Sequence, residues 1–330
     1  MCCLCDFSTS SSSFGGYGLS LDLREDAARL VDDEAFAHHL VSLSKRLIEL
    51  NQGLPRLAGL FAAQQRWLLS HAALAHHFWA INTGKTKLTR RVLANLALKN
   101  TLSSRNTAYA FFDEVVAYDV INPIESVSDR EAVEYVPAPA TISMLCAWYS
   151  AHLNALDAIY GGNRASWFMD DPHSILRLLQ PELAYMLLSI PEVREPGPLY
   201  TIFTWADAGG LLMDRLVAGI EPSAIGKRDC LQTNLVSISF LAKATGLSRA
   251  HTSRKLSTAA QIGGIGWLGP KGHSSIWISH GFYKEYAQMQ ALKLLILDHA
   301  CSRVRSLLSD SSNGAGQLPQ YGPNGERSDS

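Results

Sequence analysis

The sequence predicts a mainly α-helical protein with two tandem helix-turn-helix units, each followed by a β-wing and a long helix, in a pseudo-twofold arrangement. Three observations lead to this prediction. Apolar residues recur at helical spacing through most of the 330 residues. In the last third, glycine and serine breaks separate two helices, and a strand-like alternation follows them. A similar pattern of apolar and capping residues occurs 145 positions earlier.

The two helices of the second unit are bounded by clear stop and start signals. Apolar residues at helical spacing predict a first helix over residues 235–245, which Gly246 ends. Ser248 can accept hydrogen bonds from the free N–H groups of a following helix, so we expect it to be the N-cap of a second helix. This second helix is expected to run to about residue 262, where Gly263 and a further glycine stop it. It is the candidate recognition helix.

A short β-hairpin is expected directly after this helix. Residues 265–268 are apolar, residues 270–273 are rich in turn formers, and residues 275–279 alternate like a strand. A strand, a basic turn and a second strand are typical of a wing. Together the helices and the hairpin indicate a winged helix-turn-helix unit.

Polar and basic side chains are concentrated on the candidate recognition helix and the wing. Such donors bind phosphates and the edges of purine bases. We expect Arg249, Lys255 and Lys271 to neutralise phosphates, and Arg254, His251 and Ser253 to contact base edges. The predicted DNA-contacting residues of this unit are Ser248, Arg249, His251, Ser253, Arg254, Lys255, Lys271 and His273.

The stretch Leu-Ala-Lys-Ala-Thr-Gly-Leu-Ser-Arg at residues 241–249, with Ser253, Arg254 and Gly263, resembles the MarR-type winged-helix transcription regulators. The wing and a long final helix from about Phe282 extend the resemblance to about a quarter of the chain. It implies binding of double-stranded DNA as a dimer whose two winged helices enter successive major grooves. The wing departs from the family pattern, because it is short and carries lysine and histidine where an arginine is often found.

The earlier half repeats this pattern at an offset of 145 residues. Leu93, Leu96, Ala97, Leu102, Ser103, Thr107, Phe111 and Val115 align with Ile238, Leu241, Ala242, Leu247, Ser248, Thr252, Leu256 and Ala260. Residues 120–136 are expected to form a second wing, and residues 141–160 its trailing helix. An internal duplication would place two winged-helix units, related by a pseudo-twofold axis as in a dimer, within one chain. The candidate DNA contacts of the first unit are Ser104, Arg105, Asn106, Tyr109 and Arg130.

The two units differ in charge. Residues 227–305 contain eleven basic and three acidic residues, whereas residues 85–136 contain seven of each, and the whole chain has a net charge of −1. The basic second unit favours a DNA-binding transcriptional regulator. The neutral first unit suits a protein surface, so a winged-helix adaptor in a regulatory complex, without direct DNA readout, is the alternative. The sequence leaves open the operator, the sign of regulation and whether the chain associates with itself.

Composition divides the chain into four parts. Residues 1–20 and 309–330 are rich in serine and glycine and are expected to be disordered tails. The first unit is assigned to residues 21–162 and the second to residues 163–308. Helical spacing predicts the flanking helices at residues 21–50, 55–80, 172–190 and 200–219.

The cysteine pattern indicates a cytoplasmic protein, and no membrane span is expected because the most apolar run, residues 141–160, contains His152, Asn154 and Asp157. Three of the six cysteines, Cys2, Cys3 and Cys5, crowd at the start, which is no secreted disulfide framework, and no signal peptide precedes them. Cys2 and Cys5 form a CxxC pair, but a second pair is missing, so no metal site is predicted. The role of these thiols stays open.

The sequence contains no convincing motif for catalysis or for cofactor binding. Residues 264–269 fit GxGxxG by letter, but they follow a helix, whereas a dinucleotide site needs a strand before the glycines. No nucleophile, acid–base pair or metal constellation stands at a workable spacing. We therefore expect neither enzyme activity nor a cofactor.

The resemblance also implies a pocket for a small aromatic effector between the wings and the long helices. Aromatic and histidine side chains that could line it are Trp67, His71, Phe78, Trp79 and Trp205. Core packing is the favoured explanation for the same residues.

Overall fold

A computed structural model describes residues 19–53, 55–85, 87–124, 132–205, 209–225 and 229–312. Most of both predicted tails lies outside these ranges, as do Arg130 and the N-terminal cysteine cluster. Within them the chain is mainly helical, as predicted, with two small antiparallel sheets. None of the described helices has the length and apolar character that a membrane span requires.

The first half of the chain contains seven described helices and one strand pair. The helices are α1 (Leu19–Asp32), α2 (Glu34–Gly53), α3 (Pro55–Phe61), α4 (Gln64–Thr83), α5 (Arg90–Lys99), α6 (Arg105–Ala117) and α7 (Pro139–Tyr160). Strands β1 (Ile121–Pro123) and β2 (Tyr135–Pro137) pair antiparallel between α6 and α7. The single helix expected over residues 21–50 is wrong, because Asp33 interrupts it and accepts a hydrogen bond from the Ala35 N–H group, 2.9 Å away.

The second half has a comparable order of elements. It contains α8 (Arg164–Asp170), α9 (Pro172–Ser189), α10 (Pro191–Arg194), α11 (Pro198–Thr204), α12 (Gly209–Ala218), the 3₁₀ turn η1 (Pro222–Ala224), α13 (Ile238–Thr245), α14 (Arg249–Gln261) and α15 (His280–Ser312). Strands β4 (Ile265–Trp267) and β5 (Ile276–Ser279) pair antiparallel, and β3 (Cys230–Gln232) pairs with the other edge of β5. The sequence analysis missed β3.

Local signals explain where α13 and α14 begin and end. Ser237 is the N-cap of α13, and its hydroxyl accepts a hydrogen bond from the Phe240 N–H group at 3.1 Å. Gly246 ends α13 with a left-handed backbone, φ 70°, which only glycine adopts at low cost. Ser248 is the N-cap of α14, as predicted. The first helix therefore starts at Ile238, three residues after the expected position.

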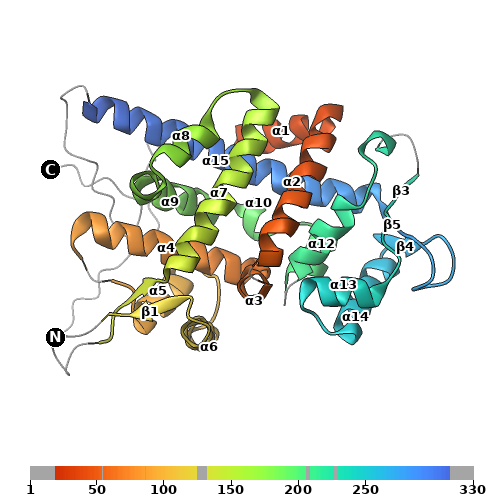
Figure 1. Ribbon diagram of the computed structural model, residues 1–330, viewed down its shortest axis with the longest axis horizontal. Coiled ribbons are helices and arrows are strands. Elements are labelled where there is room, and N and C mark those ends of the chain that lie inside the picture. Colours follow the sequence, from red (N-terminus) through yellow and green to blue (C-terminus); the bar gives the residue numbers. More distant parts are fainter. Residues whose placement is uncertain are drawn as a thin grey trace.

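Pairs of helices pack across the two halves in a matching way. Helix α2 contacts α7 of its own half and α12 of the other, and α9 contacts α15 of its own half and α4 of the other. Likewise α1 packs on α15 and α8 packs on α7. In Figure 1 the α5–α6 pair and the α13–α14 pair both lie along the lower edge of the view, with α3 between them. One continuous hydrophobic core joins the halves.

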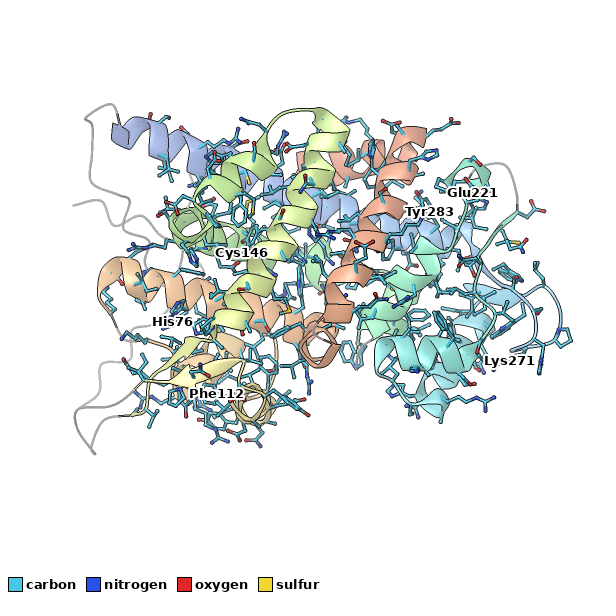
Figure 2. All side chains as sticks on the ribbon, viewed as in Figure 1. His76, Phe112, Cys146, Glu221, Lys271 and Tyr283 are labelled. Atoms are coloured by element: carbon cyan, nitrogen blue, oxygen red, sulfur yellow. The ribbon has the colours of Figure 1, made fainter. Side chains whose placement is uncertain are left out.

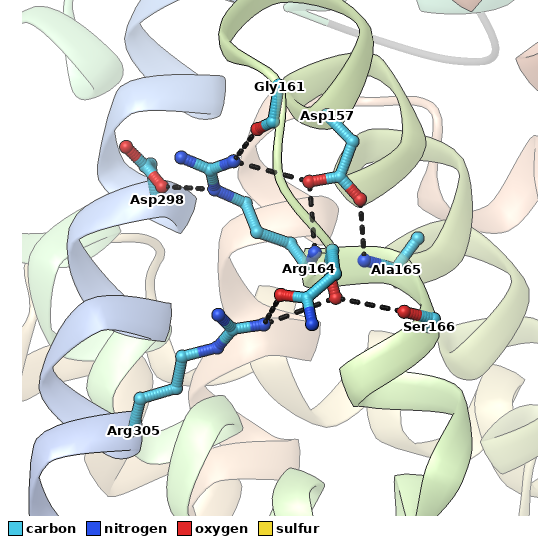
Figure 3. A network of polar contacts seen from close by, with 8 residues as sticks. Asp157, Gly161, Arg164, Ala165, Ser166, Asp298 and Arg305 are labelled. Carbon is cyan, nitrogen blue, oxygen red and sulfur yellow. Dashed lines mark hydrogen bonds and ion pairs between the residues drawn. The ribbon is translucent and has the colours of Figure 1, made fainter.

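A half-buried arginine fixes the junction between α7, α8 and α15 (Figure 3). The Arg164 guanidinium donates to Asp298 Oδ1 at 2.6 Å, to Asp157 Oδ1 at 3.2 Å and to the Gly161 carbonyl at 2.6 Å. Asp157 also accepts the backbone N–H groups of Arg164 and Ala165, both at 2.9 Å. The two carboxylates come from helices more than a hundred residues apart, so this one side chain ties α15 to the start of α8.

We expect Arg164→Met to lower the free energy of unfolding by about 2 kcal/mol, because it leaves two carboxylates without their shared cation. The Arg164 side chain is 19 % exposed, so solvent screens this pair only in part. Urea unfolding measures the change. Arg46→Met is the control: it removes the exposed ion pair with Glu49 and should cost less than about 0.5 kcal/mol. Equal losses in the two variants would contradict the prediction.

Candidate functional site: a basic helix and wing, and a cavity

Helix α14 buries one face and exposes the other. Its cap, Ser248, accepts a hydrogen bond from the His251 N–H group at 3.2 Å. The buried side chains are Thr252, Lys255, Leu256 and Ala259, spaced three and four residues apart as one helical face requires. Arg249 and Arg254 are exposed, and His251 and Ser253 are half-buried. The first two turns therefore present two guanidinium groups to solvent.

Lys255 corrects the sequence analysis, which assigned it to a phosphate. Its side chain is only 7 % exposed, and its ammonium donates to the carbonyls of Ile202 and Phe203 at 3.1 and 3.2 Å. These carbonyls stand near the C-terminal end of α11, where a helix has unpaired acceptors and a negative dipole end. A buried ammonium needs such partners. Lys255 holds α14 against α11 and does not face a ligand surface.

The loop between β4 and β5, which is the expected wing, carries Lys271 beside the exposed side of α14. Lys271 is exposed, donates to Ser257 Oγ at 2.7 Å, and lies 5.1 Å above the Trp267 ring. His273 is also exposed, in a turn closed by the hydrogen bond from its N–H group to the Pro270 carbonyl at 3.0 Å. Figure 2 shows Lys271 at the outer end of the wing, across the molecule from Phe112 on α6. The hydrogen bond from Lys271 to Ser257 thus places a basic loop against the helix that carries Arg249 and Arg254.

The two exposed arginines of α14 have no neutralising carboxylate among the residues that the structure describes. Neither Arg249 nor Arg254 forms an ion pair with any residue in the ranges that the structure describes. Lys271 bonds a hydroxyl and not a carboxylate. We name Arg249, His251, Ser253, Arg254, Lys271 and His273 the basic face.

The corresponding surface of the first unit is different. Ser104 is the N-cap of α6, and Arg105 and Asn106 are exposed beside it, but Tyr109 is half-buried with the Arg90 guanidinium 4.2 Å from its ring. Arg90 also donates twice to Asp113, at 2.9 and 2.6 Å. Further along α6, Glu114 binds Arg66 at 2.8 Å. Internal ion pairs therefore neutralise most charge here, and Arg130 lies outside the described residues.

The two helices correspond at an offset one residue smaller than predicted. Ser104, and not Ser103, is the cap, which stands 144 positions before Ser248 (248 minus 104). At the same offset the buried residues of the helices coincide: Ala108, Phe111, Phe112 and Val115 match Thr252, Lys255, Leu256 and Ala259. Lys255 thus occupies the position of a core phenylalanine.

A cavity of about 190 Å³ lies among helices of both halves. Its walls come from α2, α3, α4 and α7 of the first half and from α11, α12 and α15 of the second. Of the five aromatic and histidine candidates, Trp67 and His71 line it. Phe78 and Trp79 are buried elsewhere along α4, and Trp205 is 79 % exposed after α11. The sequence analysis therefore identified two wall residues and missed the others.

Helix α11 forms one wall of the cavity and is held at both ends. Glu285 of α15 accepts the Tyr200 N–H group at 2.8 Å, near its first turn. The carboxylate approaches so closely that a Cβ at Gly197 would lie 2.3 Å from its carbon, so a larger residue there would have to displace the Glu285 side chain. Tyr200 and Thr204 face the cavity, and Lys255 binds the carbonyls near the other end.

Burial controls the titration of the cavity walls. Burial, together with the nearby Lys293 ammonium, lowers the pKa of His71 to about 3. Burial also lowers the pKa of His152 to about 4 and raises that of Asp214 to about 6, although the Tyr286 hydroxyl donates to this carboxylate at 2.6 Å. At pH 7 the two histidines are neutral and Asp214 is charged.

Lys293 is the cation of the cavity. It lies 4.6 Å above the Trp67 ring and donates to the Tyr200 hydroxyl at 3.3 Å.

The described residues include no cluster of three metal-binding side chains, and Cys146, Cys230 and Cys301 are free thiols. Comparisons with protein-family models, with curated proteins and with solved structures give no significant match to this chain.

Proposed function

We propose that the chain is a sequence-specific transcriptional regulator that binds double-stranded DNA with α14 in a major groove. The observation that supports it most is the basic face: exposed arginines on the first turns of a helix, continuous with a wing lysine, and without a neutralising carboxylate in the described part of the chain. Phosphate contacts give affinity and base contacts give specificity.

We further propose that α13, α14, β3, β4 and β5 form a winged helix-turn-helix and that the first half is a diverged copy of it. The equal caps and burial patterns of α6 and α14 support this. So does the isolated antiparallel bridge of Leu88 with Tyr135, which has the position in the first half that the pairing of β3 with β5 has in the second. The matching contacts of α2 with α12 and of α9 with α4 support a pseudo-twofold relation. MarR-type regulators are the family that the sequence resembles.

Within this proposal the residues of the basic face have different roles. Arg249 and Lys271 neutralise phosphates on either side of the groove. Arg254 reads a base edge, with His251 and Ser253 beside it, because arginine can donate two hydrogen bonds to guanine. Lys255 takes no part, since its ammonium is bound to α11.

The first unit supports a second candidate function, protein binding. The ion pairs of Arg90 with Asp113 and of Arg66 with Glu114 engage two arginines beside α6, so that Arg105 is the basic side chain that α6 itself offers to a phosphate backbone. A chain with one DNA-binding and one protein-binding winged helix would occupy a single half-site. With both units on DNA, half-sites about 10 bp apart and unlike in sequence are expected. Footprinting separates these cases by the length of the protected region.

We expect Arg254→Ala to weaken binding to a selected DNA site by about 1–3 kcal/mol and to relax its specificity. Arg249→Ala should weaken binding to all sequences and lower the salt slope by about 1. Affinity for random and selected duplexes at several salt concentrations measures both effects.

Arg105→Ala is the matched control, because Arg105 is the first residue of α6 as Arg249 is of α14. No change in this variant would leave DNA binding to the second unit alone, whereas a loss would assign DNA contact to both units. If the intact, folded chain binds no DNA at low salt, the DNA-binding proposal is wrong and the adaptor function is favoured.

A further inference from the structure

Trp205 is the one tryptophan whose ring the fold leaves in solvent. The chain contains seven tryptophans. Six of them are buried or half-buried, whereas Trp205 is 79 % exposed. Its backbone is nevertheless ordered, because it has helical φ and ψ of −61° and −38° and its N–H group donates to the Thr201 carbonyl at 2.9 Å. The end of α11 therefore holds an indole ring outside the protein, although tryptophan is highly buried on average.

The segment that carries Trp205 is attached to the second unit. The ammonium of Lys255 on α14 binds the carbonyls of Ile202 and Phe203, which precede Trp205 by three and two residues. Gly209, at the start of α12, lies so close to the Phe203 carbonyl that a Cβ there would clash with it. These contacts fix the position of Trp205 relative to the recognition helix.

The same segment touches the first unit. Gly210 lies against the Ala62 carbonyl, and a Cβ at this glycine would be 2.8 Å from that oxygen. Ala62 follows α3, and Arg66 in the first turn of α4 binds Glu114 of α6 at 2.8 Å. In Figure 1, α3 lies between the α5–α6 pair and the α13–α14 pair. Trp205 therefore belongs to the region that joins the two units, between α6 and α14.

Helices α3 and α11 have equivalent places in the two halves. Each begins with a proline, spans seven residues and precedes a long helix of its half, α4 or α12. Their starts are 143 positions apart (198 minus 55), and at this offset the buried residues Leu60 and Phe203 coincide. Trp205 then corresponds to Ala62 (205 minus 62). Of the two equivalent positions beside the proposed pseudo-twofold axis, one carries a large aromatic side chain and the other a methyl group.

The geometry of a duplex brings its minor groove to this region. Two recognition helices in successive major grooves on one face of B-DNA leave a minor groove between them, facing the protein. Apolar side chains that enter a minor groove can insert between two base pairs, which unstacks them and kinks the duplex. The basic face on α14 attracts the phosphate backbone to the same side of the protein. A rigidly mounted, exposed indole ring is suited to such insertion.

We propose that Trp205 inserts into the minor groove at the centre of the DNA site and kinks the duplex there. This inference rests on the proposed function and requires both units on one duplex. Unstacking costs least at a pyrimidine–purine step such as TA, so the chain selects TA at the centre of its site without a hydrogen bond to those bases. Trp205 thus adds specificity that neither recognition helix provides.

Acrylamide quenching of tryptophan fluorescence tests the contact, because Trp205 supplies the readily quenched signal. The probe is a duplex of about 30 bp that the full-length chain selects from a random pool, long enough for two half-sites one turn apart. We expect saturating duplex to remove the readily quenched signal of the parent chain. Trp205→Phe should lack this signal with and without DNA. A duplex that binds, as anisotropy reports, but leaves Trp205 accessible to acrylamide would overturn the insertion and leave the proposed function standing.

Trp205→Ala tests the kink. It should lower the affinity for the selected duplex about tenfold, reduce the bend measured by circular permutation, and abolish the preference for TA at the centre. Its Tm should equal that of the parent, because the side chain is exposed. Tyr160→Ala is the matched control and should change none of these, since it removes another exposed aromatic side chain, at the end of α7.

The outcomes separate this inference from the proposed function. An unchanged bend and an unchanged central preference in Trp205→Ala, with DNA still bound, would refute the insertion alone. A parent chain that binds no duplex at low salt would refute both.

Discussion

Lowering the pH from 7 to 5 is expected to reduce the free energy of unfolding of this chain by about 4 kcal/mol, because buried histidines must gain protons when the chain unfolds. Burial holds the pKa of His71 near 3, and those of His77 and His152 near 4, whereas a histidine in the unfolded chain titrates near 6.5. Between pH 6.5 and 5 the unfolded state therefore binds more protons than the folded state. Each histidine contributes about 2 kcal/mol to the loss.

Asp214 acts in the opposite direction over part of the same range. Burial raises its pKa to about 6, above the value of 3.8 for an ordinary aspartate, so the folded state binds the extra proton between these values. Its contribution to stability is complete at low pH and is lost as the pH rises through 6. From pH 7 to 5 it returns about 1–1.5 kcal/mol, which is less than the histidines remove.

Urea unfolding at pH 7, 6 and 5 measures how the free energy of unfolding changes with pH. For each variant the values at the three pH values are compared with one another, so that a difference in overall stability between variants cancels. The double change His71→Gln and His152→Gln should remove about 4 kcal/mol of pH dependence and leave the stability nearly level. His38→Gln, at an exposed position on α2, is the control and should keep the parent slope. A parent chain equally stable at pH 5 and pH 7 would show that these histidines are accessible to protons.

Replacing Lys255 with methionine is expected to lower the free energy of unfolding by about 3 kcal/mol. Methionine has a similar length, so the loss reports the two hydrogen bonds from the ammonium to the Ile202 and Phe203 carbonyls. Bonds to a charged donor contribute about 1.5–3 kcal/mol each, and the abandoned carbonyls stay partly buried.

Chemical denaturation checks this value, with Lys243→Met as the control because Lys243 is an exposed lysine on the neighbouring α13. The control should change stability by less than about 0.5 kcal/mol. Similar behaviour of the two lysines would mean that Lys255 reaches solvent, as the sequence analysis expected. The comparison thus tests the structural role directly.

Local chemistry made the bounds of α13 and α14 largely predictable. Ser248, Gly246 and Gly263 act on the backbone next to them, so their effect can be inferred without the rest of the fold. The order of elements and the mainly helical class were predicted from the same signals. The break at Asp33 and strand β3 were missed, because both are short and their neighbours continue an apolar pattern.

Lys255 shows where residue type misled the interpretation. Thr252, Leu256 and Ala259 lie on the buried face of α14, and helical spacing places residue 255 on that same face. The lysine was nevertheless assigned to DNA because cations are usually exposed. Its partners are carbonyls about fifty residues earlier in the chain, which periodicity does not reveal. The same reason hid Asp214, Gln290 and Lys293, since only the folded chain brings them together.

The short helix α11 has a mechanical consequence. One side of it forms a wall of the cavity through Tyr200 and Thr204, and its carbonyls hold the ammonium of Lys255 on α14. A molecule that displaces this wall must either carry α14 along or break two charge-assisted hydrogen bonds. Helix α11 therefore couples the cavity to α14. If a molecule in the cavity changes the affinity of α14 for its ligand, that ligand changes the affinity of the cavity by the same factor.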